Sequence, residues 1–167
     1  MGANNVAVAD AGPILHLYEI DLIELFDIWN QVLIPQAVWD ETVAMQRVPA
    51  SRLTEMSVFS LRYVPTDALR QFVREFQFEK LHAGEQECLF VCREEGVPFL
   101  LTDDLAVRRA AKRLGVRPVG SLGVIVRGYR LGRFSLREAK MHLRALQNVS
   151  SLFVTPEIVE LAIRQLE

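Results

Sequence analysis

The sequence predicts an α/β protein in which a central parallel sheet is covered by helices on both faces. Short apolar runs that suit buried strands alternate with longer segments whose apolar residues recur at helical spacing. Such alternation is typical of βαβ units, whose strands run parallel. The chain has 167 residues, half of them hydrophobic, which is enough for one domain with a full core. We therefore expect a single domain over residues 1–167.

In the first half of the chain, proline and aspartate residues separate the expected elements. Pro13 suits the first turn of a helix, Asp21 is a candidate N-cap for the next helix, and Pro35 ends the second strand. The apolar pattern predicts the order strand, helix, helix, strand, helix, strand and helix, over residues 6–10, 13–18, 22–29, 32–34, 36–44, 62–64 and 68–76.

In the second half, Gly96 and Gly115 suit helix C-termini, and Ser135 suits an N-cap. Residues 120–123 (GSLG) are expected to form a tight turn. The predicted order is helix, strand, helix, strand and three helices, over residues 82–95, 98–102, 105–114, 116–119, 124–130, 136–146 and 157–166. We therefore expect residues 126–167 to form a C-terminal helical extension of the domain.

Carboxylates lie where these elements begin or end. Asp10 closes the first strand, Asp103 and Asp104 follow the strand over residues 98–102, and Glu41 and Glu85 lie on helices. The carboxyl ends of parallel strands meet at one edge of an open sheet, where active sites form. Clustered carboxylates repel each other unless a cation lies among them. The pattern therefore predicts a site for Mg²⁺ or Mn²⁺.

Four segments at these positions resemble the PIN-domain nucleases, in particular the VapC-like branch. They are residues 8–15 (VADAGPIL), 33–41 (LIPQAVWDE), 84–87 (GEQE) and 101–111 (LTDDLAVRRAA). The resemblance implies a PIN-like three-layer α/β/α sandwich with an acidic pocket that binds Mg²⁺ or Mn²⁺. It also implies an endoribonuclease that hydrolyses RNA as the toxin of a toxin–antitoxin pair, with an antitoxin protein as its partner.

The resemblance and the residue chemistry together nominate specific side chains. The expected catalytic residues are Asp10, Glu41, Glu85 and Asp104, and the expected metal ligands are Asp10, Glu85, Asp103 and Asp104. Either Asp103 or Asp104 could instead cap the following helix, so the sequence leaves their roles open. Glu87 points elsewhere on its helix and is the weaker candidate. Residues expected to bind substrate or to brace the carboxylates are Thr102, Arg108 and Ser121. His16, with apolar neighbours, is expected at the core or its rim.

Basic residues are concentrated in one part of the chain. Residues 105–144 hold eleven lysines and arginines against one acid, Glu138, although the whole chain has a net charge of −2. This distribution suits a polyanion such as RNA, and it also suits solvated helix faces. The alternative to an endoribonuclease is a non-catalytic PIN-like module that binds RNA or a protein. A phospho-acceptor receiver domain is disfavoured because Asp10 is followed by Ala11 rather than by a second acid.

Composition also bears on location and assembly. Cys88 and Cys92 lie in an apolar helical pattern and are expected to be buried, reduced thiols. No apolar stretch approaches the roughly 20 residues that span a bilayer, and residues 1–5 lack the features of a signal peptide. We therefore expect a cytoplasmic protein with no membrane association. Apolar residues near the C-terminus predict a homodimer: Leu152, Phe153, Val154, Ile158, Val159 and Leu161.

Overall fold

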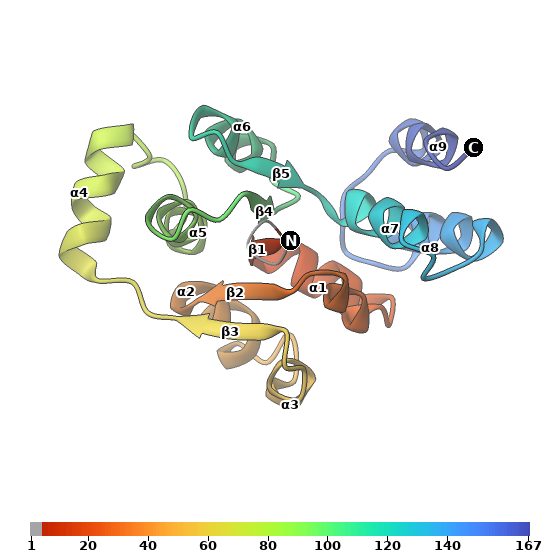
Figure 1. The fold of residues 1–167 in the computed structure, drawn as a ribbon, viewed down its shortest axis with the longest axis horizontal. Coiled ribbons are helices and arrows are strands. Elements are labelled where there is room, and N and C mark those ends of the chain that lie inside the picture. Colours follow the sequence, from red (N-terminus) through yellow and green to blue (C-terminus); the bar gives the residue numbers. More distant parts are fainter. Residues whose placement is uncertain (1–4) are drawn as a thin grey trace.

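The computed structural model describes residues 5–167, and its centre is a five-stranded sheet (Figure 1). Residues 1–4, on which the signal-peptide expectation partly depends, lie outside the described residues. All neighbouring strands are parallel, in the order β3-β2-β1-β4-β5. The strands are β1 (Val6–Ala9), β2 (Gln31–Pro35), β3 (Phe59–Arg62), β4 (Phe99–Leu101) and β5 (Arg117–Val119). The predicted α/β fold with a central parallel sheet is confirmed.

The strand order creates a switch point beside β1. The chain moves outward from β1 to β2 and β3, and it then crosses back to place β4 on the other side of β1. Val8 consequently pairs in register with Leu33 on one side and with Leu100 on the other. In open α/β sheets, ligands bind beyond the carboxyl ends of the strands at such a switch point. Asp10, which directly follows β1, lies there.

Helices cover both faces of the sheet (Figure 1). On one face, α5 (Ala83–Glu94) packs across β1, β2 and β4, and it contacts both α4 (Thr66–Phe76) and α6 (Leu105–Arg113). The helices of the opposite layer pack on one another. They are α1 (Ala11–Glu19), the 3₁₀ helix η1 (Ile23–Ile28) and α7 (Ser121–Arg130).

The helix expected over residues 36–44 is divided in two. A short helix, α2 (Gln36–Trp39), continues into a π-helical turn, η2 (Asp40–Ala44), and α3 (Ala50–Thr54) follows. The buried hydroxyl of Thr42 donates to the carbonyl of Val38 at 2.8 Å. Such a bond competes with the helical hydrogen-bond ladder and bends a helix. Glu41 lies inside the π-helical turn, which is why its direction could not be read from ordinary helical spacing.

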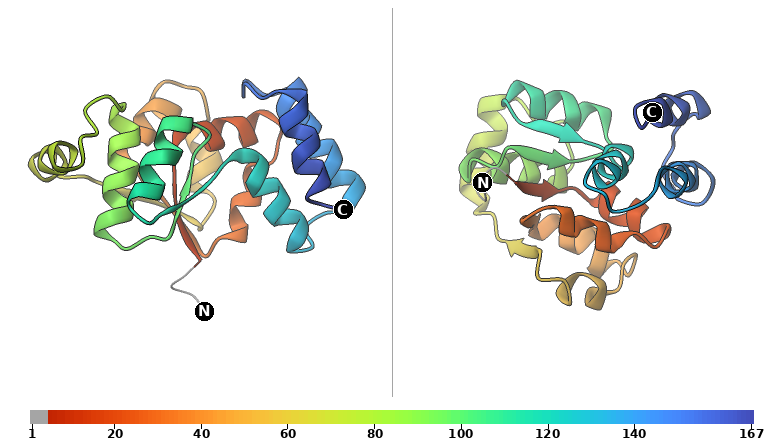
Figure 2. Two further views of the ribbon diagram at one scale, coloured as in Figure 1. Left: turned by 90° about the horizontal axis from the view of Figure 1, so that it is seen from above. Right: turned by 45° about the vertical axis from the view of Figure 1, so that its right-hand side comes forward.

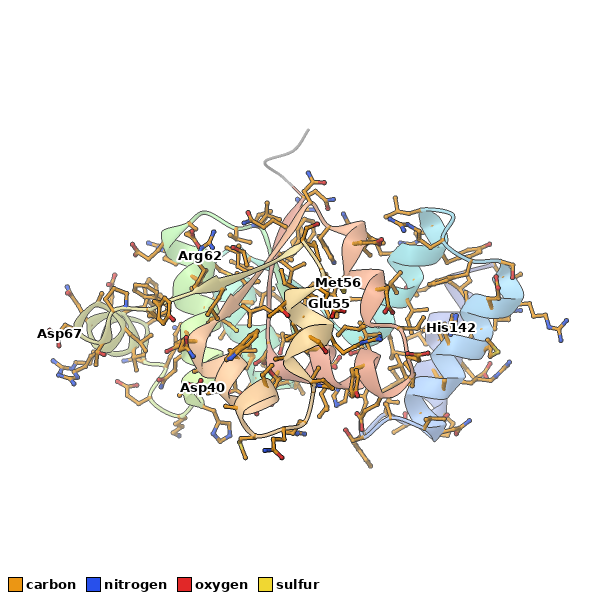
Figure 3. The ribbon with its side chains drawn as sticks, turned by 90° about the horizontal axis from the view of Figure 1, so that it is seen from below. Asp40, Glu55, Met56, Arg62, Asp67 and His142 are labelled. Carbon is orange, nitrogen blue, oxygen red and sulfur yellow. The ribbon has the colours of Figure 1, made fainter. Side chains whose placement is uncertain are left out.

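The C-terminal helices lie beside α7 rather than on the sheet. Figure 2 shows α8 (Leu136–Asn148) and α9 (Pro156–Arg164) as a pair at one end of the molecule. Figure 3 places His142 of α8 and Asp67 of α4 at opposite ends of the protein. Residue 126, where the helical extension was expected to begin, falls inside α7. In residues 5–167 we find no helix that is both long and apolar enough to cross a membrane.

Two expected elements in the first half of the chain are wrong in detail. Asp21 does not cap a helix: it has a φ of 58°, Leu22 occupies the N-cap position, and the helix that follows is 3₁₀. The third strand lies at Phe59–Arg62 rather than at residues 62–64. The ring of Phe59 packs against Phe26 with centroids 5.2 Å apart, whereas Tyr63 remains 79% exposed. Core packing therefore sets the position of this strand.

The turn expected at residues 120–123 is instead the start of α7. Gly120 is the N-cap residue, and Ser121 is the first residue of the helix. The backbone N–H of Ser121 donates to the carboxylate of Asp103 at 2.7 Å. This bond satisfies one of the N–H groups that a helix N-terminus leaves unpaired, and Gly123 lies inside the helix.

Candidate active site

An open cavity of about 320 Å³ lies beyond the carboxyl ends of β1 and β4. Its wall includes all five acidic positions that the sequence nominated. These residues come from four separate parts of the chain, and they are Asp10, Glu41, Glu85, Asp103 and Asp104. We call this space the acidic cavity.

Asp10 is the most enclosed of these acids, with only 7% of its surface exposed. Its Oδ1 accepts a hydrogen bond from the N–H of Ala11 at 2.9 Å, and its Oδ2 accepts one from the hydroxyl of Thr102 at 3.0 Å. Burial raises the pKa of Asp10 from 3.8 to about 6. This pKa already includes smaller upward contributions from the charges of Glu85 and Glu41 and the opposing effect of the two hydrogen bonds. Asp10 is therefore fixed in place by hydrogen bonds, and its burial disfavours the ionised form of its carboxyl group.

Glu85 lies in the first turn of α5. Its carboxylate accepts a hydrogen bond from the N–H of His82 at 2.9 Å. Burial raises the pKa of Glu85, and the charges of Asp104 and Glu41 raise it as well. The Glu41 carboxylate lies against the start of α5, because a Cβ at the preceding Gly84 would lie 3.4 Å from Oε2 of Glu41. These acids are thus close enough to act on one another electrostatically.

Asp103 and Asp104 are neighbours with different surroundings. The Oδ2 atom of Asp103 accepts the hydroxyl of Ser121 at 2.6 Å and lies 2.7 Å from Nδ1 of His16. Asp104 is exposed, and its Oδ1 caps α6 by accepting the N–H of Val107 at 2.9 Å. We infer that Asp103 holds the loop after β4 in place. Asp104 is the better candidate for a metal ligand.

Helix N-termini explain how the fold tolerates so many acids together. Asp10 caps α1, Asp104 caps α6, Glu85 lies at the start of α5, and Asp103 binds the first N–H of α7. The unpaired N–H groups at a helix N-terminus carry a partial positive charge that stabilises nearby anions. The same bonds that satisfy the helices also orient the carboxylates around the cavity.

The three residues expected to contact substrate are also found at this site. Thr102 and Ser121 are fully buried, and their hydroxyls donate to carboxylates. We infer that they position Asp10 and Asp103, and contact with substrate stays a prediction for both. Arg108 is half-buried and donates to the carbonyl of Thr102 at 3.3 Å. It lines a second hollow beside the acidic cavity.

Sequence reasoning did not assign four further residues of the cavity wall to the site, namely His16, His82, Leu152 and Phe153. The last two belong to the segment between α8 and α9, far along the chain from the acids. The segment is held there by Ser151, whose N–H and hydroxyl donate to Glu19 of α1 at 3.1 and 2.7 Å. The short apolar run at residues 152–154 was visible in the sequence, but nothing in the sequence connected it with this site.

The donor set of the cavity fits a hard divalent cation. Carboxylate oxygens are the ligands that Mg²⁺ and Mn²⁺ prefer, and within the chain the buried Asp10 is balanced by two neutral donors. Across residues 5–167, no three His, Cys, Asp or Glu side chains are drawn together tightly enough to form a ready-made metal cluster. Because Mg²⁺ usually retains several water molecules, a looser group of carboxylates suits it.

A family model described as PIN domain (DUF3368) matches residues 6–167. The chain belongs to the PIN-domain family. The match covers nearly the whole protein and includes α8 and α9. PIN domains are generally nucleases and typically use divalent metals. No curated protein matches the chain.

Proposed function

We propose that this PIN-domain protein is a divalent-metal-dependent endoribonuclease that hydrolyses RNA phosphodiester bonds. One observation carries the proposal: five acidic side chains line a single cavity at the switch point of the sheet. Hydrolysis of a phosphodiester requires an activated water molecule and relief of the negative charge on phosphate. A bound Mg²⁺ or Mn²⁺ ion would supply both effects.

Each acid has a distinct part in this proposal. Asp10, Glu85 and Asp104 would hold the ion, because each lines the cavity and is fixed by a hydrogen bond from a backbone N–H. Glu41 would complete the acidic wall from the π-helical turn. Asp103 would support the site through the loop that follows β4.

The wider biological role is a further part of the proposal. We propose that the protein is a VapC-like toxin whose antitoxin covers the acidic cavity, since the acids of an open cavity are accessible to a basic side chain of a partner. The homodimer also stays a prediction. Val159 is buried within the chain itself, whereas Ile158 and Leu161 on α9 are 48% and 55% exposed.

The decisive experiment measures cleavage of a labelled single-stranded RNA with Mg²⁺ or Mn²⁺, against the same reaction in EDTA. The Asp10→Asn variant keeps the shape of the side chain but removes the charge that a hard cation requires. We expect its cleavage rate to fall at least about 100-fold, since even groups behind the ligands are typically worth about 10–100-fold. Asp67→Asn is the control, because its exposed carboxylate lies on α4 at one end of the molecule (Figure 3).

A second pair of variants separates the two neighbouring aspartates. Asp104→Asn keeps an oxygen that can cap α6, so it should lose cleavage while the protein stays folded. Asp103→Asn should mainly lower stability, because its carboxylate holds both Ser121 and His16.

Two outcomes would contradict the proposed function. If the wild-type protein binds RNA but cleaves none, the alternative function, a non-catalytic binding module, is favoured. Cleavage that persists in EDTA would exclude the metal-dependent mechanism.

A further inference from the structure

We propose that an apolar groove beside the acidic cavity binds an unpaired nucleobase of the substrate, and that Phe153 is the surface on which this base stacks. This inference rests on the proposed nuclease function and adds a recognition site to it. The groove has a volume of about 460 Å³, within the range of about 300–1,000 Å³ that small-molecule sites occupy. Its wall includes Leu105, Arg108, Phe153, Ile158 and Leu161.

Phe153 is an exposed aromatic residue that directly follows an anchored segment of backbone. Its side chain is 94% exposed, more than any other large hydrophobic side chain in residues 5–167. The backbone before it is fixed, because Ser151 donates twice to Glu19 and the N–H of Leu152 donates to the hydroxyl of Ser150 at 3.2 Å. Exposing an aromatic ring to water is unfavourable. The ring on this anchored segment is therefore available to a partner that can cover its apolar surface.

The groove adjoins the acidic cavity. Asp103, Leu152 and Phe153 line both spaces, so Phe153 lies at their junction. In a nucleic acid, each base is attached through one sugar to the phosphate beside it. A nucleotide whose phosphate lies at the carboxylates would therefore carry its base to Phe153 and into the groove.

The chemistry of the groove fits a base better than a purely apolar partner. Its apolar walls suit the two faces of a base, and Arg108 adds a cation that can pair with a phosphate or lie against a π-system. The hydrogen bond from Arg108 to the carbonyl of Thr102 keeps this cation in place. Gly120 gives it space, since a Cβ there would lie 3.2 Å from Nη1 of Arg108. Exposed aromatic rings combined with basic groups are how proteins bind single strands with unstacked bases.

The test is binding of end-labelled single-stranded oligouridylate and oligoadenylate, measured by fluorescence anisotropy in EDTA so that no cleavage occurs. We expect Phe153→Ala and Phe153→Leu to weaken binding at least about fivefold, because stacking of one base on an aromatic ring contributes at least that much. Phe153→Trp should bind about as tightly as the wild type. The matched control is Tyr63→Ala, an exposed aromatic at the opposite edge of the sheet. A strand with abasic sugars should bind wild type and Phe153→Ala equally.

Three results would overturn the base-binding groove. The first is equal binding by Phe153→Ala and wild type, which includes the case in which neither binds. The second is full binding by Phe153→Leu, since an apolar contact would then suffice without stacking. The third is a fall in molar mass from dimer to monomer on Phe153→Ala, measured by light scattering, which would make a second copy of the chain the occupant.

A parallel cleavage assay with Mn²⁺ separates this inference from the nuclease proposal. If the wild type cleaves RNA and Phe153→Ala has the same KM, the base-binding role of the groove is wrong and the nuclease function is retained. If binding depends on Phe153 but no RNA is cleaved, the nuclease function is wrong and the groove is a binding site for single-stranded RNA. A raised KM with a smaller change in kcat supports both.

Discussion

The hydroxyl of Ser121 donates a 2.6 Å hydrogen bond to Oδ2 of Asp103, and the N–H of the same serine donates to Oδ1 at 2.7 Å. One residue thus occupies both carboxylate oxygens and joins the start of α7 to the loop after β4. His16 approaches Oδ2 from α1. Asp103 is therefore the point at which three elements of the site meet.

This contact predicts a stability effect of Ser121→Ala. The change removes a buried hydroxyl that binds a charged acceptor, a loss of about 1.5–3 kcal/mol in the free energy of unfolding. Urea denaturation would measure it, with the exposed Ser57→Ala as a control that should change stability by less than about 0.5 kcal/mol. Equal midpoints for the two variants would show that the Ser121 hydroxyl contributes nothing to stability.

Asp10 predicts an unusual dependence of stability on pH. Its pKa is about 6 in the folded protein and 3.8 as an ordinary aspartate, so between these values the unfolded chain releases a proton that the folded chain keeps. The contribution of Asp10 to the free energy of unfolding is therefore greatest below about pH 4, falls as pH rises towards 6, and stays low above that. The total loss is up to about 3 kcal/mol.

Asp10→Asn tests this linkage in EDTA. The neutral side chain should raise the free energy of unfolding at about pH 7 by up to about 3 kcal/mol and should have little effect near pH 4. Chemical denaturation at both pH values measures the difference. A variant that is less stable than the wild type at about pH 7 would show that the Asp10 charge is well compensated. A variant that is more stable but inactive would mean that the Asp10 carboxylate lowers the free energy of unfolding and is needed for activity.

The fold was largely predictable from the sequence because its elements are short, apolar and separated by strong signals. Gly96 and Gly115 end helices with φ values of 64° and 74°, as their positions predicted. The 3₁₀ helix after Asp21 and the π-helical turn around Glu41 were not predictable. Both depend on tertiary contacts and on the side-chain bonding of residues such as Thr42, which periodicity does not contain.

The sequence predicted which acidic residues lie at the site, but it did not predict the different role of each carboxylate. Nothing local distinguishes Asp103 from Asp104, since the difference comes from Ser121 and His16, which lie elsewhere in the chain. Glu87 differs, because helical spacing alone predicted that it points elsewhere than Glu85. Its carboxylate accepts the N–H of Ala37 at 2.8 Å and supports α2 instead of lining the cavity.

Gly120 predicts a steric effect at the site. A Cβ there would lie 2.9 Å from Oδ1 of Asp103 and 3.2 Å from Nη1 of Arg108, and close packing makes such contacts costly. Gly120→Ala should therefore lower the free energy of unfolding by about 1–3 kcal/mol. The control is Gly12→Ala, whose Cβ would make an ordinary contact 3.5 Å from His16 and whose helical position favours alanine by up to about 1 kcal/mol.

The two glycine variants are best compared by thermal unfolding. A change of 1 kcal/mol moves the Tm of a protein of this size by roughly 2–4 °C. Gly120→Ala should melt earlier than the wild type, and Gly12→Ala at the same temperature or later. A Gly120→Ala protein with unchanged Tm would mean that Asp103 and Arg108 shift away easily, and the proposed rigidity of the site would then be wrong.

Arg108 and Arg109 form a matched pair for testing phosphate contact. Both lie on α6, but Arg108 lines the groove beside the acids, whereas Arg109 is exposed and lines neither the groove nor the acidic cavity. Removing one phosphate contact should weaken binding of single-stranded RNA and lower the slope of log K against log salt by about 0.7. We expect this change for Arg108→Ala and little change for Arg109→Ala. Binding isotherms at several salt concentrations in EDTA would measure it.

Arg108→Lys completes this comparison, because lysine keeps the charge but cannot reproduce the planar geometry of the guanidinium group. A normal salt slope with weakened binding would mean that the charge reaches phosphate and that the geometry contributes separately, through the bond to Thr102 or the contact with a base. Equal slopes for Arg108→Ala and Arg109→Ala would instead assign RNA attraction to the general positive charge of α6. Arg108 would then have no specific contact with substrate, and its role would be limited to holding the loop that carries Asp103 and Asp104.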